Sequence, residues 1–198
     1  MASDMICPEV CPMSEKVPCA ECGTPIRPRK TDMMKGLCVR CFAKHRQRKA
    51  TPLGDLYLDL MHRVHETDAG FDGLSEPERL YYVITRLRNE VNNGGFHQYF
   101  FNSSGSYYSH AEAGLLKLGA TQTLALLHLA KEIVFPDEPV PTDTEIRRAH
   151  MFSRDANPDE SELMRRLDEL DQRFYHSPDD ITPRLEAFAR ENGLVEAE

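Results

Sequence analysis

The sequence predicts an all-α fold in which an acidic multi-helix domain, residues 52–198, follows a small cysteine-rich module, residues 1–50. Two observations predict the helical domain: apolar residues recur there at helical spacing, and the strict apolar/polar alternation of half-buried strands is essentially absent from the sequence. A third observation predicts the separate module, because all six cysteines lie within the first 41 residues.

Four of the cysteines form two Cys-x-x-Cys pairs, Cys19/Cys22 and Cys38/Cys41, with fifteen residues between the pairs. This spacing is typical of two zinc knuckles that together close one tetrahedral site with four thiolate ligands. A module of this size, a zinc ribbon or treble clef, cannot bury enough apolar surface to fold alone, so bound zinc would supply most of its folding free energy. We therefore predict a structural zinc ion, with a disulfide framework as the alternative.

The other cysteines and a nearby histidine leave several roles open. Cys7 and Cys11 can be two thiols near a flexible end, which we favour, or a second partial metal site, or an alternative ligand pair. His45 can replace a cysteine ligand or lie on a solvated helix. The string CAECGTPIRPRK…GLCVRCFAKHRQRK resembles the treble-clef and ribbon fingers of bacterial transcription regulators, which are too widespread to indicate one function.

Charge divides the chain at the same place. Residues 1–50 hold ten Lys/Arg against five Asp/Glu, whereas the rest of the chain holds 14 against 27. Such asymmetry indicates different partners for the two parts. The basic stretch, residues 27–49, can be a solvated face, or it can dock on an acidic surface of this protein or of a second copy. Alternatively, it contacts nucleic acid phosphates. The candidate residues for that role are Arg27, Arg29, Lys30, Arg46 and Arg48.

The helices of the acidic domain follow from apolar stripes and capping residues. An apolar stripe predicts a helix from residue 53 to about residue 66. Ser75-Glu-Pro-Glu78 is a capping box that opens the next helix, which Asn92-Asn-Gly-Gly95 ends before a short aromatic turn over residues 96–101. Further helices are expected over residues 109–118 and 120–134, from a cap at Thr142, from a capping box at residues 157–160, and from Ser177-Pro178 onward.

One segment of this domain, residues 92–105, reads NNGGFHQYFFNSSG. Together with the Ala/Leu-rich helix that follows and Gly119-Ala120 at the next helix, it resembles the family of bacterial acidic DNA-mimic proteins over roughly residues 53–194. The resemblance implies an all-α, homodimeric domain whose surface carboxylates imitate DNA phosphates and occupy the DNA-binding face of a transcription factor. The cysteine module departs from that pattern.

The same segment can be interpreted from its residues alone. Its four aromatic residues, Phe96, Tyr99, Phe100 and Phe101, are expected to be core anchors. His97 and Gln98 lie between them and can be polar site residues. The interpretation that we favour is that they satisfy backbone groups at the helix junction, because buried polar side chains are normally used in that way.

Mimicry of DNA requires exposed, spaced carboxylates. Residues 155–198 hold 13 acidic residues against five arginines. Carboxylates on adjacent helices can approximate the roughly 7 Å separation of alternate phosphates on one strand, although an acidic face that only keeps the protein soluble is the alternative. The candidate partner-binding residues are Asp155, Asp159, Glu160, Glu162, Asp168, Glu169, Asp171, Asp179 and Asp180.

Catalysis and membrane insertion are not expected. The sequence has no P-loop, Rossmann or Gly-x-Ser-x-Gly pattern, and His62 and His65 have no third metal ligand nearby, so we expect no enzyme. It also has no run of 18 apolar residues and no secretory signal, so we expect a cytoplasmic protein. We therefore predict a binding protein whose partner is a basic or DNA-binding protein. The alternative is a nucleic-acid-binding regulator that acts through the zinc finger, with the helical body as its dimerisation or effector domain.

Overall fold

The computed structural model describes residues 17–23, 25–26, 51–155, 160–176 and 179–196. The chain forms two units, Met1–Thr51 and Pro52–Glu198. In the first unit, strands β1 (Val17–Pro18) and β2 (Pro25–Ile26) pair as an antiparallel hairpin. The second unit is the helical body, residues 52–198, and no strand occurs among its described residues.

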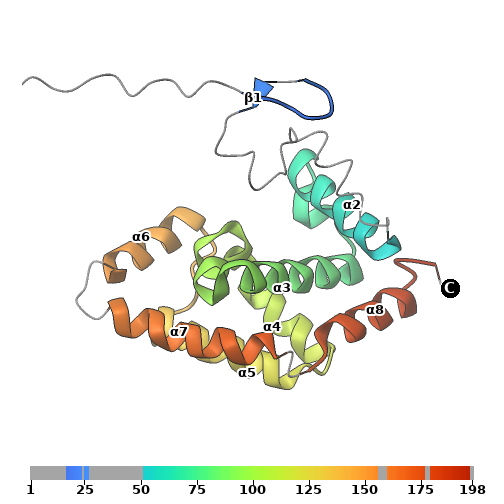
Figure 1. Cartoon of the computed structure of the whole chain (residues 1–198). Helices are drawn as coiled ribbons and strands as arrows, with labels where there is room; N and C mark the ends of the chain where they lie inside the picture. Colours follow the sequence, from blue (N-terminus) through green and yellow to red (C-terminus); the bar gives the residue numbers. More distant parts are fainter. Residues whose placement is uncertain (1–16, 24, 27–50, 156–159, 177–178, 197–198) are drawn as a thin grey trace, which may run out of the picture. The chain divides into compact units, whose positions relative to one another are not determined.

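Seven α-helices and two 3-10 helices make up the described part of the body (Figure 1). They are α2 (Pro52–Glu66), η2 (Gly70–Gly73), α3 (Glu76–Phe101), η3 (Ser103–Tyr107), α4 (Tyr108–Lys117), α5 (Thr121–Val134), α6 (Thr144–Asp155), α7 (Glu160–Tyr175) and α8 (Ile181–Glu191). The all-α class predicted for the body is thus confirmed. The 3-10 helices have no counterpart in the sequence prediction, because such short turns carry no apolar periodicity. None of the described helices combines the length and the apolar character that a membrane span requires.

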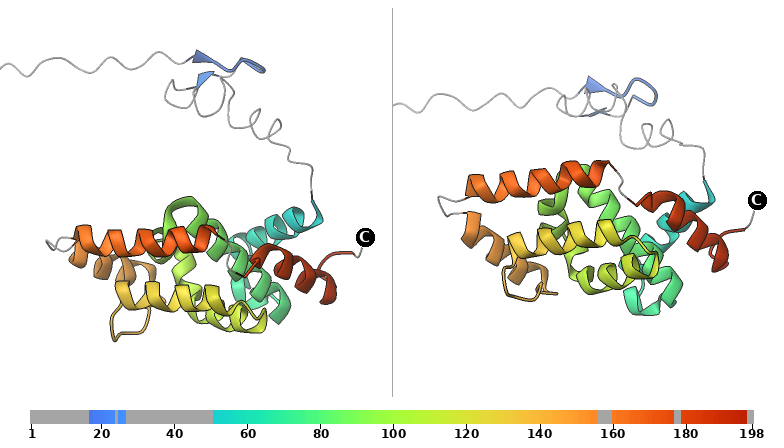
Figure 2. Two further views of the ribbon diagram at one scale, coloured as in Figure 1. Left: turned by 60° about the horizontal axis from the view of Figure 1, so that its bottom comes forward. Right: turned by 90° about the horizontal axis from the view of Figure 1, so that it is seen from below.

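Helix α3 is the centre of the body. It packs against α2, α4, α6, α7 and α8, as Figure 1 shows. Leu80, Ile84, Leu87 and Val91 are buried, in agreement with the predicted apolar stripe. All residues from 80 to 85 are buried as well, so other elements enclose this part of α3 on nearly every side. Helices α5 and α7 lie side by side (Figure 2) and complete the core with α3.

The helix starts follow capping rules, with one correction. The Glu78 carboxylate accepts the Ser75 backbone N–H at 2.7 Å, so the predicted capping box does open α3. Asp143, and not the predicted Thr142, caps α6, because its carboxylate accepts the N–H groups of residues 145 and 146 at 2.8 and 2.9 Å. The starts predicted for the last two helices rest partly on residues 157–159 and 177–178, which lie outside the described residues.

Candidate functional site

The signature segment, residues 92–105, begins at a break inside α3. Gly94 and Gly95 have non-helical backbone angles, and Gly95 has a φ of 75°. The predicted helix stop is therefore present, although α3 resumes directly after it. A Cβ atom at Gly95 would overlap the carboxylate of Asp171 on α7. Asp171 accepts the backbone N–H of Phe96 at 2.8 Å. Gly95 thus allows α7 to cap the second half of α3.

Asp171 and Asp179 belong to the interior of the body, which corrects their placement on an exposed acidic surface. Both side chains are buried. Burial raises the pKa of the Asp171 carboxyl, and the hydrogen bond from the Phe96 N–H opposes that rise. Asp179 accepts the backbone N–H of Thr123, in the first turn of α5, at 2.6 Å. Each acid therefore satisfies the start of a helix and is inaccessible to a partner.

The other candidate acids differ in their surroundings. Glu162, Asp168 and Glu169 are exposed on α7, and Asp180 is exposed directly before α8. Arg165 forms an ion pair with Glu162 at 2.7 Å and another with Glu169. The α7 row therefore carries less net charge than its carboxylates alone suggest. The side chains of Asp155, Asp159 and Glu160 lie outside the described residues.

Glu90 is the centre of a polar network that the signature segment builds. Its side chain is only 11% exposed, and Arg86 forms an ion pair with it at 3.3 Å. The Glu90 carboxylate accepts hydrogen bonds from Gln98 at 2.7 Å and from Asn102 and Ser104 at 2.8 Å. Burial acts to raise the pKa of Glu90, but these hydrogen bonds and the Arg86 charge outweigh it and hold the pKa below its usual value.

The two polar residues of the aromatic turn have different roles. The Gln98 side chain donates to Glu90 and accepts a hydrogen bond from Asn93 at 3.1 Å. It therefore joins side chains of α3 rather than satisfying backbone groups, the role that we favoured. His97 is half-buried and stacks on Phe101, with ring centroids 6.0 Å apart. The remaining aromatic residues of the turn are buried as predicted, namely Phe96, Tyr99 and Phe100.

The end of the signature segment encloses the buried guanidinium of Arg147, from α6. A Cβ atom on Gly105 would lie only 2.7 Å from Arg147 Nε, so a glycine leaves the necessary space. Arg147 donates to the carbonyl oxygens of Phe100 at 2.5 Å and Asn102 at 2.7 Å. Arg147 is not among the site residues predicted from the sequence. The sequence contains a hint of its burial, because Arg147 lies one helical turn before the apolar residue Met151, which is buried in the structure.

Most of the exposed charge on the body is negative. Among the body residues whose side chains the structure describes, 17 of 23 acidic residues are exposed, against six of 13 arginines and lysines. Several of the enclosed cations hold internal groups: Arg147 binds carbonyl oxygens, Arg86 pairs with Glu90, and Arg63 pairs with Glu78. The surface is therefore more acidic than the composition alone indicates.

The first cysteine pair lies in the turn of the β1–β2 hairpin. Cys19 is buried and Cys22 is exposed, and the Gly23 N–H donates to the Cys19 carbonyl at 3.0 Å. Gly23 has a φ of 70°, as expected for a tight knuckle turn. This turn fits one half of the predicted zinc site. The rest of the candidate set lies outside the described residues, namely Cys7, Cys11, Cys38, Cys41, His45, Arg27, Arg29, Lys30, Arg46 and Arg48.

The family model described as DMP19-like protein matches residues 72–192. The matched range covers more than half of the chain and includes the signature segment and helices α3 to α8. It does not include the cysteine module. No curated protein and no solved structure matches the chain.

Proposed function

Because the chain belongs to the DMP19-like protein family, we propose that its helical body is a DNA mimic that binds a basic protein surface through exposed carboxylates. The observation that carries the proposal is the excess of acidic over basic side chains on the surface of the body: 17 of 23 described acids are exposed, against six of 13 described cations. A DNA-binding surface presents arginines and lysines to phosphates, and carboxylates can occupy the same positions. Family membership is consistent with this function.

The acids on α7 and at the start of α8 are the candidate contact surface. No ion pair among the described residues involves Asp168 or Asp180, so both charges are available to a partner. Arg165, Glu162 and Glu169 are each more than half exposed. Exposed ion pairs of this kind contribute little to stability, because water and salt screen them. A guanidinium group of the partner can therefore replace Arg165 at little cost.

We also propose that Cys19, Cys22, Cys38 and Cys41 bind one structural zinc ion. The hairpin turn around Gly23 supports the first pair, and the Cys-x-x-Cys spacing of Cys38 and Cys41 supports the second. Four thiolates fill a tetrahedral coordination shell and leave zinc no open position. The metal would therefore hold the basic module together and perform no chemistry.

Partner capture with DNA competition tests the mimicry proposal. The full chain is immobilised and exposed at low salt to a lysate of its source cell, and the bound proteins are eluted with duplex DNA. We expect DNA-binding proteins in the eluate, because a mimic and DNA compete for the same face. Recovery of no DNA-binding protein, or capture that duplex DNA does not reverse, would contradict the proposal.

Charge neutralisation then tests whether α7 is the contact surface. The variant E162Q/D168N/E169Q removes three exposed charges from α7, and the control D55N/D59N/E66Q removes three exposed charges from α2. We expect the α7 variant to bind the partner about tenfold more weakly or worse, because it loses three charge pairs with the partner at once. The control should bind the partner as the wild type does. Equal weakening by both variants would indicate general electrostatic attraction without a defined surface on α7.

A further inference from the structure

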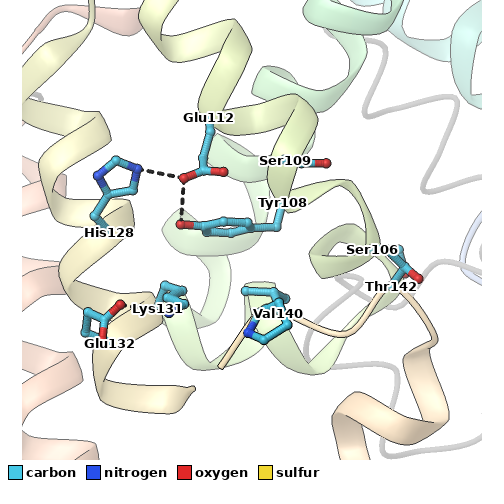
Figure 3. Close-up of a pocket in the computed structure, with 10 residues that line it drawn as sticks. Ser106, Tyr108, Ser109, Glu112, His128, Lys131, Glu132, Val140 and Thr142 are labelled. Atoms are coloured by element: carbon cyan, nitrogen blue, oxygen red, sulfur yellow. Dashed lines mark hydrogen bonds and ion pairs between the residues drawn. The ribbon is translucent and has the colours of Figure 1, made fainter. Parts of the chain in front are cut away.

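A cavity of about 650 Å³ opens between α4, α5 and the loop that leads to α6 (Figure 3). Cavities of ~300–1,000 Å³ are typical of sites for small organic ligands. The signature segment and the acids of α7 do not line this cavity. Its wall combines the ring of Tyr108 and the side chain of Val140 with several charged groups. The mixture suits a ligand that has both a carbon skeleton and a charge.

Glu112 lies at the centre of the polar wall. Its Oε1 atom accepts a hydrogen bond from the Tyr108 hydroxyl at 3.0 Å and lies 2.8 Å from Nε2 of His128. Figure 3 shows both contacts meeting at one carboxylate oxygen. Neither contact uses Oε2, so that oxygen can accept a hydrogen bond from a ligand. Two neighbours also fix the orientation of the carboxylate, which lowers the entropy cost of binding.

The charges around the cavity favour a cationic ligand. Lys131 pairs with Glu132 at 2.7 Å, so these two charges offset each other. Glu112 then gives the carboxylates and the lysine that line the cavity a net charge of −1. Burial, then Glu112 and then Glu132 raise the pKa of the Tyr108 hydroxyl, because the surroundings oppose a further negative charge. The face of the Tyr108 ring also attracts a cation.

We propose that this cavity binds the ammonium group of an organic amine. Glu112 Oε2 forms the ion pair with the ammonium group, and Tyr108 and Val140 contact the carbon chain. A free polyamine and the lysine side chain of a bound protein carry the same ammonium group, so either can supply the ligand. The site does not depend on DNA mimicry, because its residues are distinct from the α7 acids.

Isothermal titration calorimetry of the full chain at low salt tests the site. Spermidine represents a free amine, and a capped tetralysine peptide represents a protein side chain. E112Q keeps an acceptor oxygen for Tyr108 but removes the charge, so we expect both ligands to bind about tenfold more weakly. The control E66Q removes an exposed charge at the end of α2, outside the cavity, and should not change the affinity.

A second variant gives the opposite expectation. K131M releases Glu132 and adds one net negative charge to the cavity, so it should tighten amine binding. K117M breaks a similar pair with Glu76, also 2.7 Å long but outside the cavity, and should have no effect. If E112Q weakens binding, tighter binding of spermidine identifies a free amine as the ligand, and tighter binding of the tetralysine peptide identifies a protein side chain. Either result supports the site. Absence of binding by the wild type, or equal affinities of E112Q and E66Q, would overturn the proposal.

Discussion

Replacement of Glu90 by glutamine should destabilise the body strongly, although the two side chains have nearly the same shape. Glu90 Oε2 accepts hydrogen bonds from Gln98 and Asn102, and Oε1 accepts one from Ser104 and faces Arg86. A glutamine NH2 group in the Oε2 position leaves the Gln98 and Asn102 donors without an acceptor, and in the Oε1 position it faces the Arg86 guanidinium, although the Ser104 hydroxyl can then turn to accept from it. A hydrogen bond to a charged group contributes ~1.5–3 kcal/mol. Because either orientation opposes at least one donor and the neutral amide also weakens the remaining bonds, the substitution should lower the free energy of unfolding by about 3 kcal/mol.

Urea unfolding at pH 7, followed by far-UV circular dichroism, measures this loss, because all the described helices lie in the body. A change of about 3 kcal/mol lowers the unfolding midpoint by ~1–3 M urea. E76Q is the matched control, since Glu76 pairs with Lys117 at 2.7 Å but its side chain is 80% exposed. The unfolding midpoint of E76Q should therefore stay close to that of the wild type. A wild-type midpoint for E90Q, or equal losses in the two variants, would refute the role assigned to Glu90.

Three further outcomes are expected. Because the pKa of Glu90 lies below its ordinary value of 4.5, its stabilisation is present above about pH 4.5 and is lost as the pH falls through the folded-state pKa. The gap in unfolding free energy between wild type and E90Q should therefore narrow from pH 7 to pH 3. Gly95→Ala should lower the free energy of unfolding by ~2 kcal/mol or more, because the new Cβ atom overlaps the Asp171 carboxylate and the residue has a φ of 75°. Gly193→Ala is the control: it has a similar φ of 67° but open space around the Cβ atom, so it measures the backbone contribution alone. Elemental analysis should find one zinc ion per wild-type chain and none in the C38S variant, whose far-UV circular dichroism should be unchanged.

The helices could be predicted from the sequence because their signals are local. The stripe from Leu80 to Val91 and the capping box at Ser75 lie within single helices, and both are present in the structure. The contact between Asp171 and Phe96 is different, since it joins residues 75 positions apart. No local pattern indicates which helix end a distant carboxylate will cap. The network around Arg147 depends in the same way on the packing of α6 against the end of α3.

The acidic surface was only partly predictable, because charge is visible in the sequence and exposure is not. Even so, the spacing on α7 contains a signal for Asp171. Leu167, Leu170 and Phe174 form its buried stripe, and Asp171 lies within that stripe. Asp168 lies beside the stripe and is exposed. An acidic residue inside an apolar stripe is therefore better interpreted as a buried anchor than as part of a partner-binding surface.

The segment that carries the family resemblance and the acids that would carry mimicry are different parts of the body. The signature segment is internal: it surrounds Glu90, admits Asp171 at Gly95, and leaves space for Arg147 at Gly105. A resemblance that rests on these residues supports the fold more directly than it supports the partner. Substitutions in the segment would abolish partner binding simply by unfolding the body. Only changes to exposed acids such as Asp168, made in variants that keep the wild-type urea midpoint, can separate mimicry from folding.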